Sequence, residues 1–141
     1  MANPCEIRIV FNRFPILGAQ ALAAADKVCN QTAHAIEGDA KILMATSPKT
    51  GRIYMKGKHG DIAHQASAPG EPPAMDTSNL INSGFAERRA EADWEAGFSA
   101  EYALPLEFGT PKVAPRPFLR PTVEQRREGF IDMMTKAVEG L

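Results

Sequence analysis

The residues of this chain that could do chemistry are few, and their spacing limits what each could do. Residues 51–58, GRIYMKGK, suggest a phosphate-binding loop, but the second glycine comes one residue late for the G-x-x-x-x-G-K pattern. No Ser or Thr follows Lys58 to hold a magnesium ion. His59, Asp61 and His64 carry metal-binding groups, but histidines five residues apart without a nearby cysteine match no standard zinc pattern. We therefore expect no nucleotide and no metal here, and interpret both histidines as solvated loop residues.

A catalytic nucleophile or an acid–base pair is the next kind of chemistry to consider. Residues 97–101, GFSAE, approach the G-x-S-x-G nucleophile elbow, but Glu101 stands where the second glycine would fall. Glu101 and Glu107 lie close to aromatic residues, yet acid–base catalysis requires a geometry that sequence does not show, so we interpret them as surface charges. His34 falls on a predicted helix as a surface or boundary residue. We expect no catalytic residue and no cofactor, and a small hydrolase of an unfamiliar type is the least favoured hypothesis.

Basic side chains form three clusters, which we interpret first as solvated faces. If several copies of the chain formed a ring, one cluster could line a lumen and contact phosphates non-specifically. A formal net charge of −1 argues against a general nucleic-acid binder, which usually has a clear basic excess. The first two clusters also lack the interleaved aromatic residues that stack on single-stranded bases. The clusters are Lys49, Arg52, Lys56 and Lys58, then Arg88 and Arg89, then Arg116, Arg120, Arg126 and Arg127.

Length and composition indicate one globular domain. The chain has 141 residues, of which 44% are hydrophobic and 23% charged, and its 11 Gly and 11 Pro predict a large loop fraction. The N-terminal residues lack the charged leader and apolar run of a secretory signal, and no stretch approaches the roughly 18 apolar residues of a membrane span. We expect a cytoplasmic protein without a membrane partner. In that compartment Cys5 and Cys29 are expected to be reduced and structural.

Periodicity predicts the elements that position these residues. Apolar residues at steps of three and four from about residue 15 to 45 predict one long helix. Trp94, Ala96 and Phe98 alternate with polar or small residues, which predicts a strand with one buried face. Residues 56–75 contain three glycines and three prolines with little periodicity and are expected to be an irregular loop. The expected strands are 5–11, 52–55, 80–89 and 92–100, the later ones in an antiparallel meander.

The C-terminal third combines an apolar, proline-rich segment with a helix. Residues 102–125 contain five prolines, so we expect a stiff ribbon that is neither helix nor central strand over about 105–121. The TVEQ sequence at 122–125 fits a capping box, with Thr122 as the N-cap and Gln125 reaching back. Helical spacing of apolar residues from Val123 onward then predicts a C-terminal helix. The expected fold class is α+β, with a small antiparallel β-sheet packed against a long N-terminal helix and a C-terminal helix.

Three motifs carry a resemblance to a known family. They are ASAPGEPPAMDTSNLINS at 66–83, AEYALPLEFGT at 100–110, and RPFLRP at 116–121 leading into the last helix. Together they resemble the neck and tail-completion family of tailed phages, the head-tail joining proteins of long-tailed siphophages such as HK97. The resemblance covers roughly residues 13–140, and the pairing of E-F-G-T with P-F-L-R-P is fairly specific. Ser78 is a departure, because the family usually has glycine after Asp-Thr.

The resemblance implies a structural protein of the bacteriophage virion, without catalytic activity, at the head-tail junction. It implies a homo-oligomeric ring, a hexamer in the favoured case and a dodecamer in the alternative. The implied partners are the head connector or adaptor and the tail terminator or tail tube. The rival hypothesis is a DNA-contacting module that uses the basic clusters to hold the end of the packaged genome.

The resemblance also suggests what covers the apolar ribbon. Residues 107–110 would make a tight turn at the sheet edge, and residues 115–121 a rigid arm that presents Phe118 and Leu119 to a neighbour. Arg116 and Arg120 would supply hydrogen bonds at the rim. In the alternative, the ribbon folds back and caps the chain's own core. The expected interface residues are Tyr102, Glu107, Phe108, Arg116, Phe118, Leu119 and Arg120.

Overall fold

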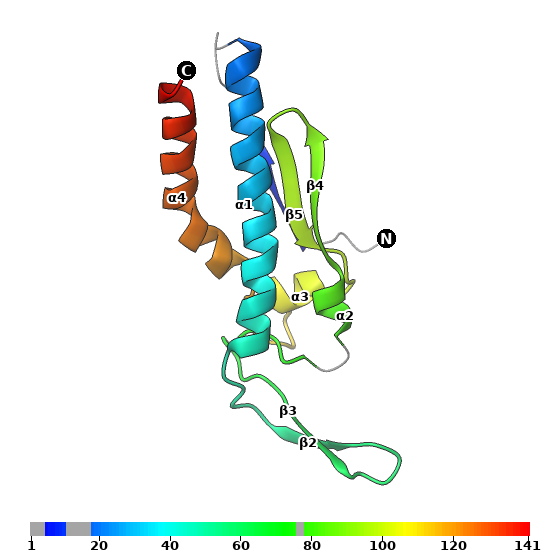
Figure 1. The fold of residues 1–141 in the computed structure, drawn as a ribbon. Helices are drawn as coiled ribbons and strands as arrows, with labels where there is room; N and C mark the ends of the chain where they lie inside the picture. Colours follow the sequence, from blue (N-terminus) through cyan, green and yellow to red (C-terminus); the bar gives the residue numbers. More distant parts are fainter. Residues whose placement is uncertain (1–4, 11–17, 76–77) are drawn as a thin grey trace.

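The computed structural model describes residues 5–10, 18–75 and 78–141, and its fold is α+β, as expected (Figure 1). Two long helices and two antiparallel sheets make up most of it. The helices are α1 (Ala19–Thr46), α2 (Asn79–Asn82), α3 (Ala103–Phe108) and α4 (Arg120–Glu139). The strands are β1 (Cys5–Val10), β2 (Ile53–Lys56), β3 (Ile62–Gln65), β4 (Gly84–Ala90) and β5 (Asp93–Phe98).

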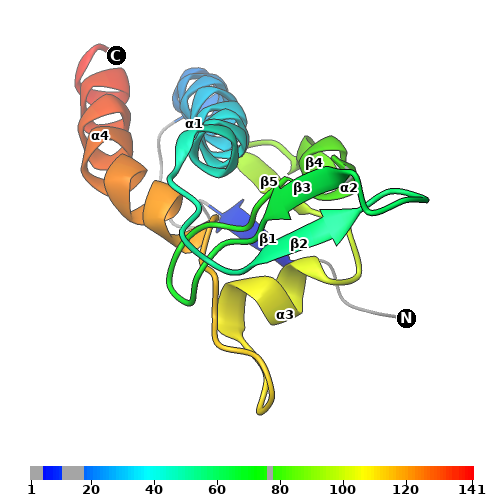
Figure 2. The ribbon, with the colours of Figure 1, turned by 90° about the horizontal axis from the view of Figure 1, so that it is seen from below.

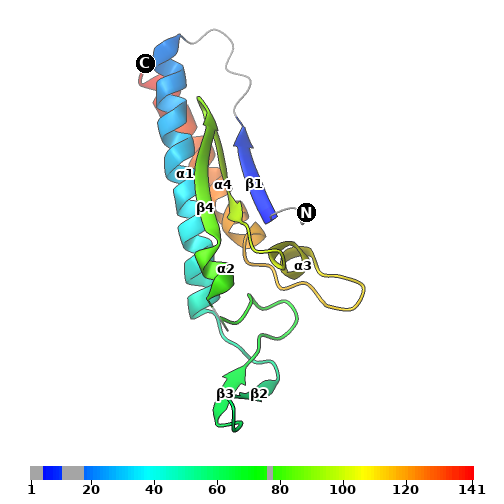
Figure 3. The ribbon, with the colours of Figure 1, turned by 90° about the vertical axis from the view of Figure 1, so that its right-hand side faces the viewer.

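The larger sheet has the order β1-β5-β4, with every neighbouring pair antiparallel. The strands β4 and β5 form a hairpin, and β1 pairs with the other edge of β5, so that Ala96 lies opposite both Ile7 and Ala86. Helix α1 runs along one face of this sheet, while α3 lies on the side away from α1 (Figures 2 and 3). The central position of β5 makes it the strand on which the core is built.

Helix α1 confirms the predicted long helix and contacts both the sheet and α4. Its buried residues follow one another at steps of three and four, and many are alanine, which lets neighbouring elements approach closely. Cys29 is buried and free, and desolvation raises the pKa of its thiol from 9.0 to about 11. It is therefore an inert packing residue at neutral pH, whereas the Cys5 side chain lies outside the described part of the chain.

Two predicted elements within the first 90 residues differ from the structure. The expected loop 56–75 contains β3, which pairs with β2 in a two-stranded hairpin. The expected strand from residue 80 begins instead with the single turn of α2, and β4 follows it. Both elements are too short for their hydrophobic period to be recognised in the sequence.

Strand β5 is buried on both faces, not on one. The predicted apolar face holds: Trp94, Ala96 and Phe98 all lie in the core. The alternate residues Asp93, Glu95 and Gly97 are buried as well, and the Arg89 guanidinium of β4 bonds the buried Glu95 carboxylate. A buried carboxylate in a strand thus has a cation supplied by the adjacent strand.

Asp26 ties the β4–β5 turn to α1. Its Oδ1 accepts hydrogen bonds from Arg88 Nε at 3.0 Å, the Ala92 backbone N–H at 2.9 Å and Trp94 Nε1 at 3.0 Å. Burial by itself would raise the pKa of this carboxyl group, but the three donors outweigh it, so the pKa is lowered from 3.8. The charged form of Asp26 is therefore the one that stabilises the fold.

We predict that Asp26→Asn lowers the free energy of unfolding by about 1–3 kcal/mol near neutral pH, because it weakens charge-assisted hydrogen bonds. Because the folded pKa lies below the unfolded value of 3.8, this contribution is present above that pH and is lost as the pH falls through the folded pKa. Urea unfolding at a series of pH values should therefore show a difference that is constant down to about pH 5 and shrinks below about pH 4. Glu139→Gln, at an exposed residue at the end of α4, is the control, and an equal effect there would contradict the assignment.

Ser78 adopts a left-handed conformation, with φ 60° and ψ 3°, immediately before α2. Its side chain makes no capping hydrogen bond that would offset this backbone conformation. Glycine adopts such a conformation without strain, because it has no Cβ. Glycine would therefore fit the backbone at position 78 better than serine does.

We predict that Ser78→Gly raises the free energy of unfolding by about 0.5–1 kcal/mol, because strain relief exceeds the added entropy of the unfolded chain. The matched control is Ser47→Gly at the end of α1, where φ is −67° and any residue fits. The free energy of unfolding of that variant should fall by about 0.5–1 kcal/mol, since glycine there adds entropy to the unfolded chain and relieves no strain. Thermal and urea unfolding of both variants measure the signs, and a loss of stability in Ser78→Gly would contradict the prediction.

Candidate interaction surfaces

The proline-rich segment after residue 102 contains a helix, contrary to the prediction. Helix α3 spans Ala103–Phe108, and Pro105 fits because it lies in the first turn, where a backbone N–H has no intrahelical partner. Glu107 and Phe108 therefore end a helix and do not form a turn at a sheet edge. Gly109 terminates α3 with φ 76°, and a Cβ there would lie 2.9 Å from Pro115, so glycine is required twice over.

Glu107 is a buried clamp on the start of α4. Glu107 is only 5% exposed. Its Oε2 accepts the backbone N–H groups of Phe118 at 2.8 Å and Leu119 at 3.0 Å. Oε1 accepts the N–H of Arg120 at 2.7 Å. These are N–H groups that a helix N-terminus leaves without partners, so a carboxylate from α3 caps α4. The interpretation of Glu107 as a surface charge was wrong.

The predicted capping box is also wrong. Helix α4 begins at Arg120, two residues before Thr122, and the side chain of its N-cap residue Leu119 makes no capping bond. Thr122 lies inside the first turn, and its hydroxyl donates to the Leu119 carbonyl at 2.7 Å. Pro121 near the start of the helix is favourable because it needs no donor partner. The cap comes from Glu107, which local sequence could not reveal.

Phe118 and Leu119 lie in the chain's own core and are not presented to a neighbour. Their exposed fractions are 0% and 1%, and the Phe118 ring meets Phe98 of β5 edge-on with centroids 5.2 Å apart. Ile36 and Met44 of α1 belong to the same cluster. The rigid presenting arm is therefore wrong, and the alternative in which the segment caps the core describes the packing. Serine at Phe118 or Leu119 would destabilise the fold itself, because it removes core volume and buries a hydroxyl.

We predict that Glu107→Ala lowers the free energy of unfolding by about 3 kcal/mol or more, because it leaves buried N–H groups without an acceptor. Glu107→Gln should lose less, about 1–2 kcal/mol, since one amide oxygen can still accept. Glu101→Gln, an exposed carboxylate beside α3, should stay within about 0.5 kcal/mol of the parent protein. Urea unfolding of the three variants measures this order, and equal effects at 101 and 107 would contradict the clamp.

Only part of the expected interface set is exposed. Tyr102, Phe108 and Arg120 are exposed, with Phe108 at 61%, while Arg116 is half-buried. The Arg116 Nε is itself buried and has no hydrogen-bond partner. Tyr102 is the N-cap residue of α3 and Phe108 is its last residue, and a separation of six does not place two side chains on one face of a helix. Whether these side chains meet a partner stays a prediction.

Sequence reasoning missed Leu104 as a companion of Phe108. The two residues are four apart on α3 and share a face, and both are exposed. The signal was present as the spacing of Leu104 and Phe108, but it was hidden by the assumption that Pro105 excludes a helix. Leu104 and Phe108 together form an exposed apolar face on α3.

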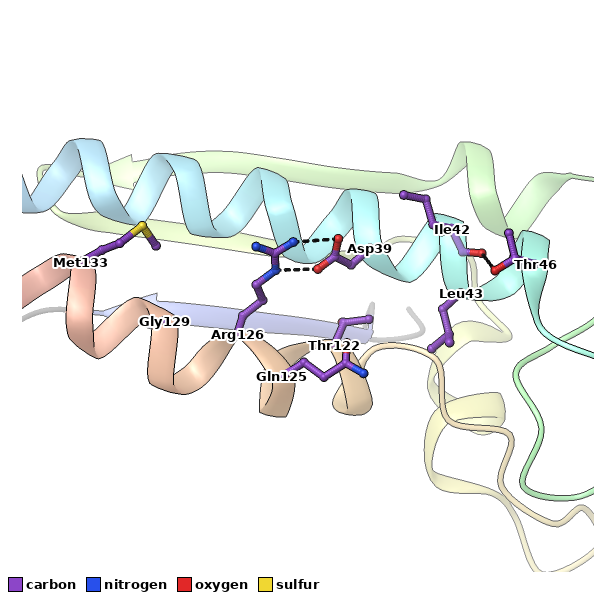
Figure 4. A pocket seen from close by; sticks show the side chains of 9 residues that line it. All are labelled: Asp39, Ile42, Leu43, Thr46, Thr122, Gln125, Arg126, Gly129 and Met133. Carbon is purple, nitrogen blue, oxygen red and sulfur yellow. Dashed lines mark hydrogen bonds and ion pairs between the residues drawn. The ribbon is translucent and has the colours of Figure 1, made fainter.

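A groove of about 510 Å³ runs between α1 and α4 (Figure 4). Arg126 spans it with two parallel bonds to Asp39, Nε to Oδ2 at 2.6 Å and Nη2 to Oδ1 at 3.0 Å. Exposed Ile42 of α1 and Met133 of α4 give it apolar walls. The groove is lined by Asp39, Ile42, Leu43, Thr46, Thr122, Gln125, Arg126, Gly129 and Met133. We name this surface the α1–α4 groove.

The β2–β3 hairpin projects from the end of α1, away from the larger sheet (Figures 1 and 3). Its large apolar side chains are exposed, and Met55 reaches 61%. The Arg52 guanidinium lies over the Tyr54 ring, 5.3 Å from its centroid. The exposed apolar residues of the hairpin are Ile53, Tyr54, Met55 and Ile62.

The base of the hairpin is held by Glu71. Its carboxylate accepts the N–H of Thr50 at 2.9 Å and of Ala68 at 2.8 Å, and also bonds the Thr50 hydroxyl. The Thr50 side chain is the main cause of the lowered pKa of Glu71. Gly51 donates its N–H to Ala66 at 2.9 Å, and a Cβ on Gly51 would lie 2.5 Å from a backbone oxygen. The two backbone segments at the base of the hairpin are thus closely packed.

Carboxylates engage both arginines of the second basic cluster and two of the four in the third. Arg88 bonds Asp26, and Arg89 bonds Glu87 and Glu95. In the last cluster, Arg126 bonds Asp39 and Arg127 bonds Glu124. In the first cluster, the Lys49 ammonium donates to the Pro72 carbonyl at 3.3 Å. The second cluster and half of the third are thus used for contacts within the chain.

His59 and Asp61 lie in the exposed turn of the hairpin, as expected of solvated loop residues, whereas His64 lies in strand β3 and is half-buried, so the loop prediction is wrong for His64. Within residues 5–10, 18–75 and 78–141, no three His, Cys, Asp or Glu side chains gather in a way that could hold a metal ion. None of the helices in these ranges has the length and apolar character that crossing a bilayer requires. Comparisons of the chain with family models, curated proteins and solved structures find no match.

Proposed function

We propose that this chain is a structural subunit of a homo-oligomeric ring in the neck of a tailed bacteriophage. The ring joins the head connector or adaptor to the tail terminator or tail tube. One observation carries the structural part of the proposal: large apolar side chains are exposed on separate parts of a small chain. Such surfaces are typical of subunits that neighbours complete. The neck location within that class rests on the sequence motifs described above.

The separation of the surfaces favours a ring over a two-fold dimer. The hairpin lies beyond one end of α1, the α1–α4 groove lies along the two long helices, and α3 lies across the sheet from α1 (Figures 1 and 2). A head-to-tail contact joins two different surfaces of neighbouring copies and closes into a ring when the rotation permits. A hexamer is the favoured stoichiometry, with a dodecamer as the alternative.

The rival proposal is a module that contacts packaged DNA. The ion pairs of Arg88, Arg89, Arg126 and Arg127 weaken it, because paired guanidinium groups must lose their partners before they meet phosphates. The two proposals differ in salt dependence, since a phosphate-binding protein loses affinity steeply as salt rises. Titration of the purified chain with double-stranded DNA at several salt concentrations distinguishes them.

The location is tested by immunogold electron microscopy of intact virions with an antibody raised against this chain. The expected result is label confined to the junction of head and tail. Absence of label from virions whose epitope is shown to be accessible would overturn the neck proposal. An antibody against a tail-tube protein is the control, because it should label the tail along its length.

The role of α3 in assembly is tested by Leu104→Ser combined with Phe108→Ser. Both side chains are exposed, so unfolding of the isolated chain should change by less than about 0.5 kcal/mol. Incorporation into virions should fall at least about tenfold if this face meets a partner, as for central interface residues. Leu141→Ser, at an exposed C-terminal residue, is the matched control. Normal incorporation of the double variant would remove α3 from the proposed interface.

A further inference from the structure

We infer that the β2–β3 hairpin of one copy docks into the α1–α4 groove of a second copy of this chain. The inference rests on the proposed ring and specifies the contact that would build it. The hairpin, defined as residues 51–66, is the donor surface. The α1–α4 groove is the acceptor surface.

The hairpin is incomplete as an isolated element. Each strand has four residues, and a lone two-stranded hairpin is marginally stable in water. Its register places Met55 opposite Ala63, and Tyr54 opposite His64 on the other face. Every residue of β2 and β3 is exposed or half-buried. Both faces therefore carry uncovered apolar groups, which favours insertion into a groove over contact with a flat surface.

The base of the hairpin sets its direction. Glu71 bonds Thr50 and Ala68, and the backbone is closely packed at Gly51. These contacts fix the two segments of the hairpin where they leave the domain. Figures 1 and 3 show the hairpin extending beyond the end of α1, away from the stretch where α1 and α4 face each other. The hairpin of one chain therefore points away from its own groove. It is preorganised for contact with another molecule.

Charge indicates that a second copy is the occupant. The hairpin carries Arg52, Lys56 and Lys58 against a single acidic residue, Asp61. The whole chain has a formal charge of −1, so the residues outside the hairpin hold an acidic excess. A basic protrusion on an otherwise acidic chain is complementary to other copies of the same chain. Contact between two hairpins would instead bring like charges together.

The α1–α4 groove offers matching chemistry. Ile42, Leu43 and Met133 give it apolar walls for the hairpin's apolar side chains. Gly129 leaves one wall open, because a Cβ there would meet nothing within 4 Å. Exposed Asp132 lies one helical turn from Gly129 on the same side of α4, where it can meet the basic side chains of a docked hairpin. Asp39 lies within the groove but is already bonded to Arg126.

The contact is tested by mixing two full-length forms that both carry Cys5→Ser, one with Met55→Cys and the other with Gly129→Cys, under mild oxidation, so that each has one introduced thiol besides buried Cys29. The expected result is a disulfide-linked dimer that forms only in the mixture, since it joins the hairpin of one copy to the groove of another. Buried Cys29 is unreactive because its pKa is raised to about 11. Mixing Met55→Cys with Glu91→Cys, an exposed residue at the β4–β5 turn, is the matched control and should give no dimer above background.

Dissociation constants give a second readout. Tyr54→Ser combined with Met55→Ser should weaken self-association at least about tenfold, measured by sedimentation, because both side chains would be buried in the groove. Near-native thermal unfolding is expected, since both residues are exposed in the single chain. Leu141→Ser should leave self-association unchanged.

The outcomes separate this inference from the proposed function. The hairpin–groove contact would be overturned if oligomers form but no disulfide links positions 55 and 129, and if serine at Tyr54 and Met55 leaves self-association unchanged. A ring built through other surfaces would then remain the proposal. A chain that stays monomeric at every concentration, without the bond, would overturn a second copy as the occupant. Virion labelling decides the neck location independently of both results.

Discussion

The structure depends first on the carboxylate of Glu107. It is buried between α3 and the start of α4, and it accepts N–H groups that lie 11 to 13 residues later in the chain. Because these N–H groups belong to Phe118, Leu119 and Arg120, the clamp places the two apolar side chains in the core and sets where α4 begins. The path of α4 along α1, and hence the α1–α4 groove, follows from that starting point.

Helix α1 is the second constraint on the fold, because both the larger sheet and α4 pack against it. Its small buried residues admit both the sheet and α4 at close range, and Asp26 fixes the far turn of the β4–β5 hairpin to it. At its other end, the chain leaves α1 directly into the β2–β3 hairpin. A rigid helix with a fixed base at its end holds the hairpin away from the domain, which suits a part that reaches a neighbour.

The distribution of charge and apolar surface separates the functional hypotheses. Most arginines of the second and third basic clusters are bonded to carboxylates of the same chain, whereas apolar side chains of the hairpin and of α3 are exposed. Exposed apolar groups favour protein partners, while DNA recognition relies on cations that are available to phosphates. In the second and third clusters this balance favours a structural subunit over a DNA-binding module, while the basic side chains of the hairpin are the ones that a DNA titration tests.

The sequence by itself determined the elements whose residues repeat with a clear period. The steps of three and four in α1, the alternation in β5 and the spacing after Val123 identified these elements and the α+β class, because each reports one face of a local structure. Tertiary structure decided what those faces meet. It turned Phe118 and Leu119 inward, made Glu107 a cap, bonded Arg126 to Asp39 across 87 residues, and paired β3 with β2. None of these has a local signal, because each arises from a partner distant in sequence or from an element too short to show a period.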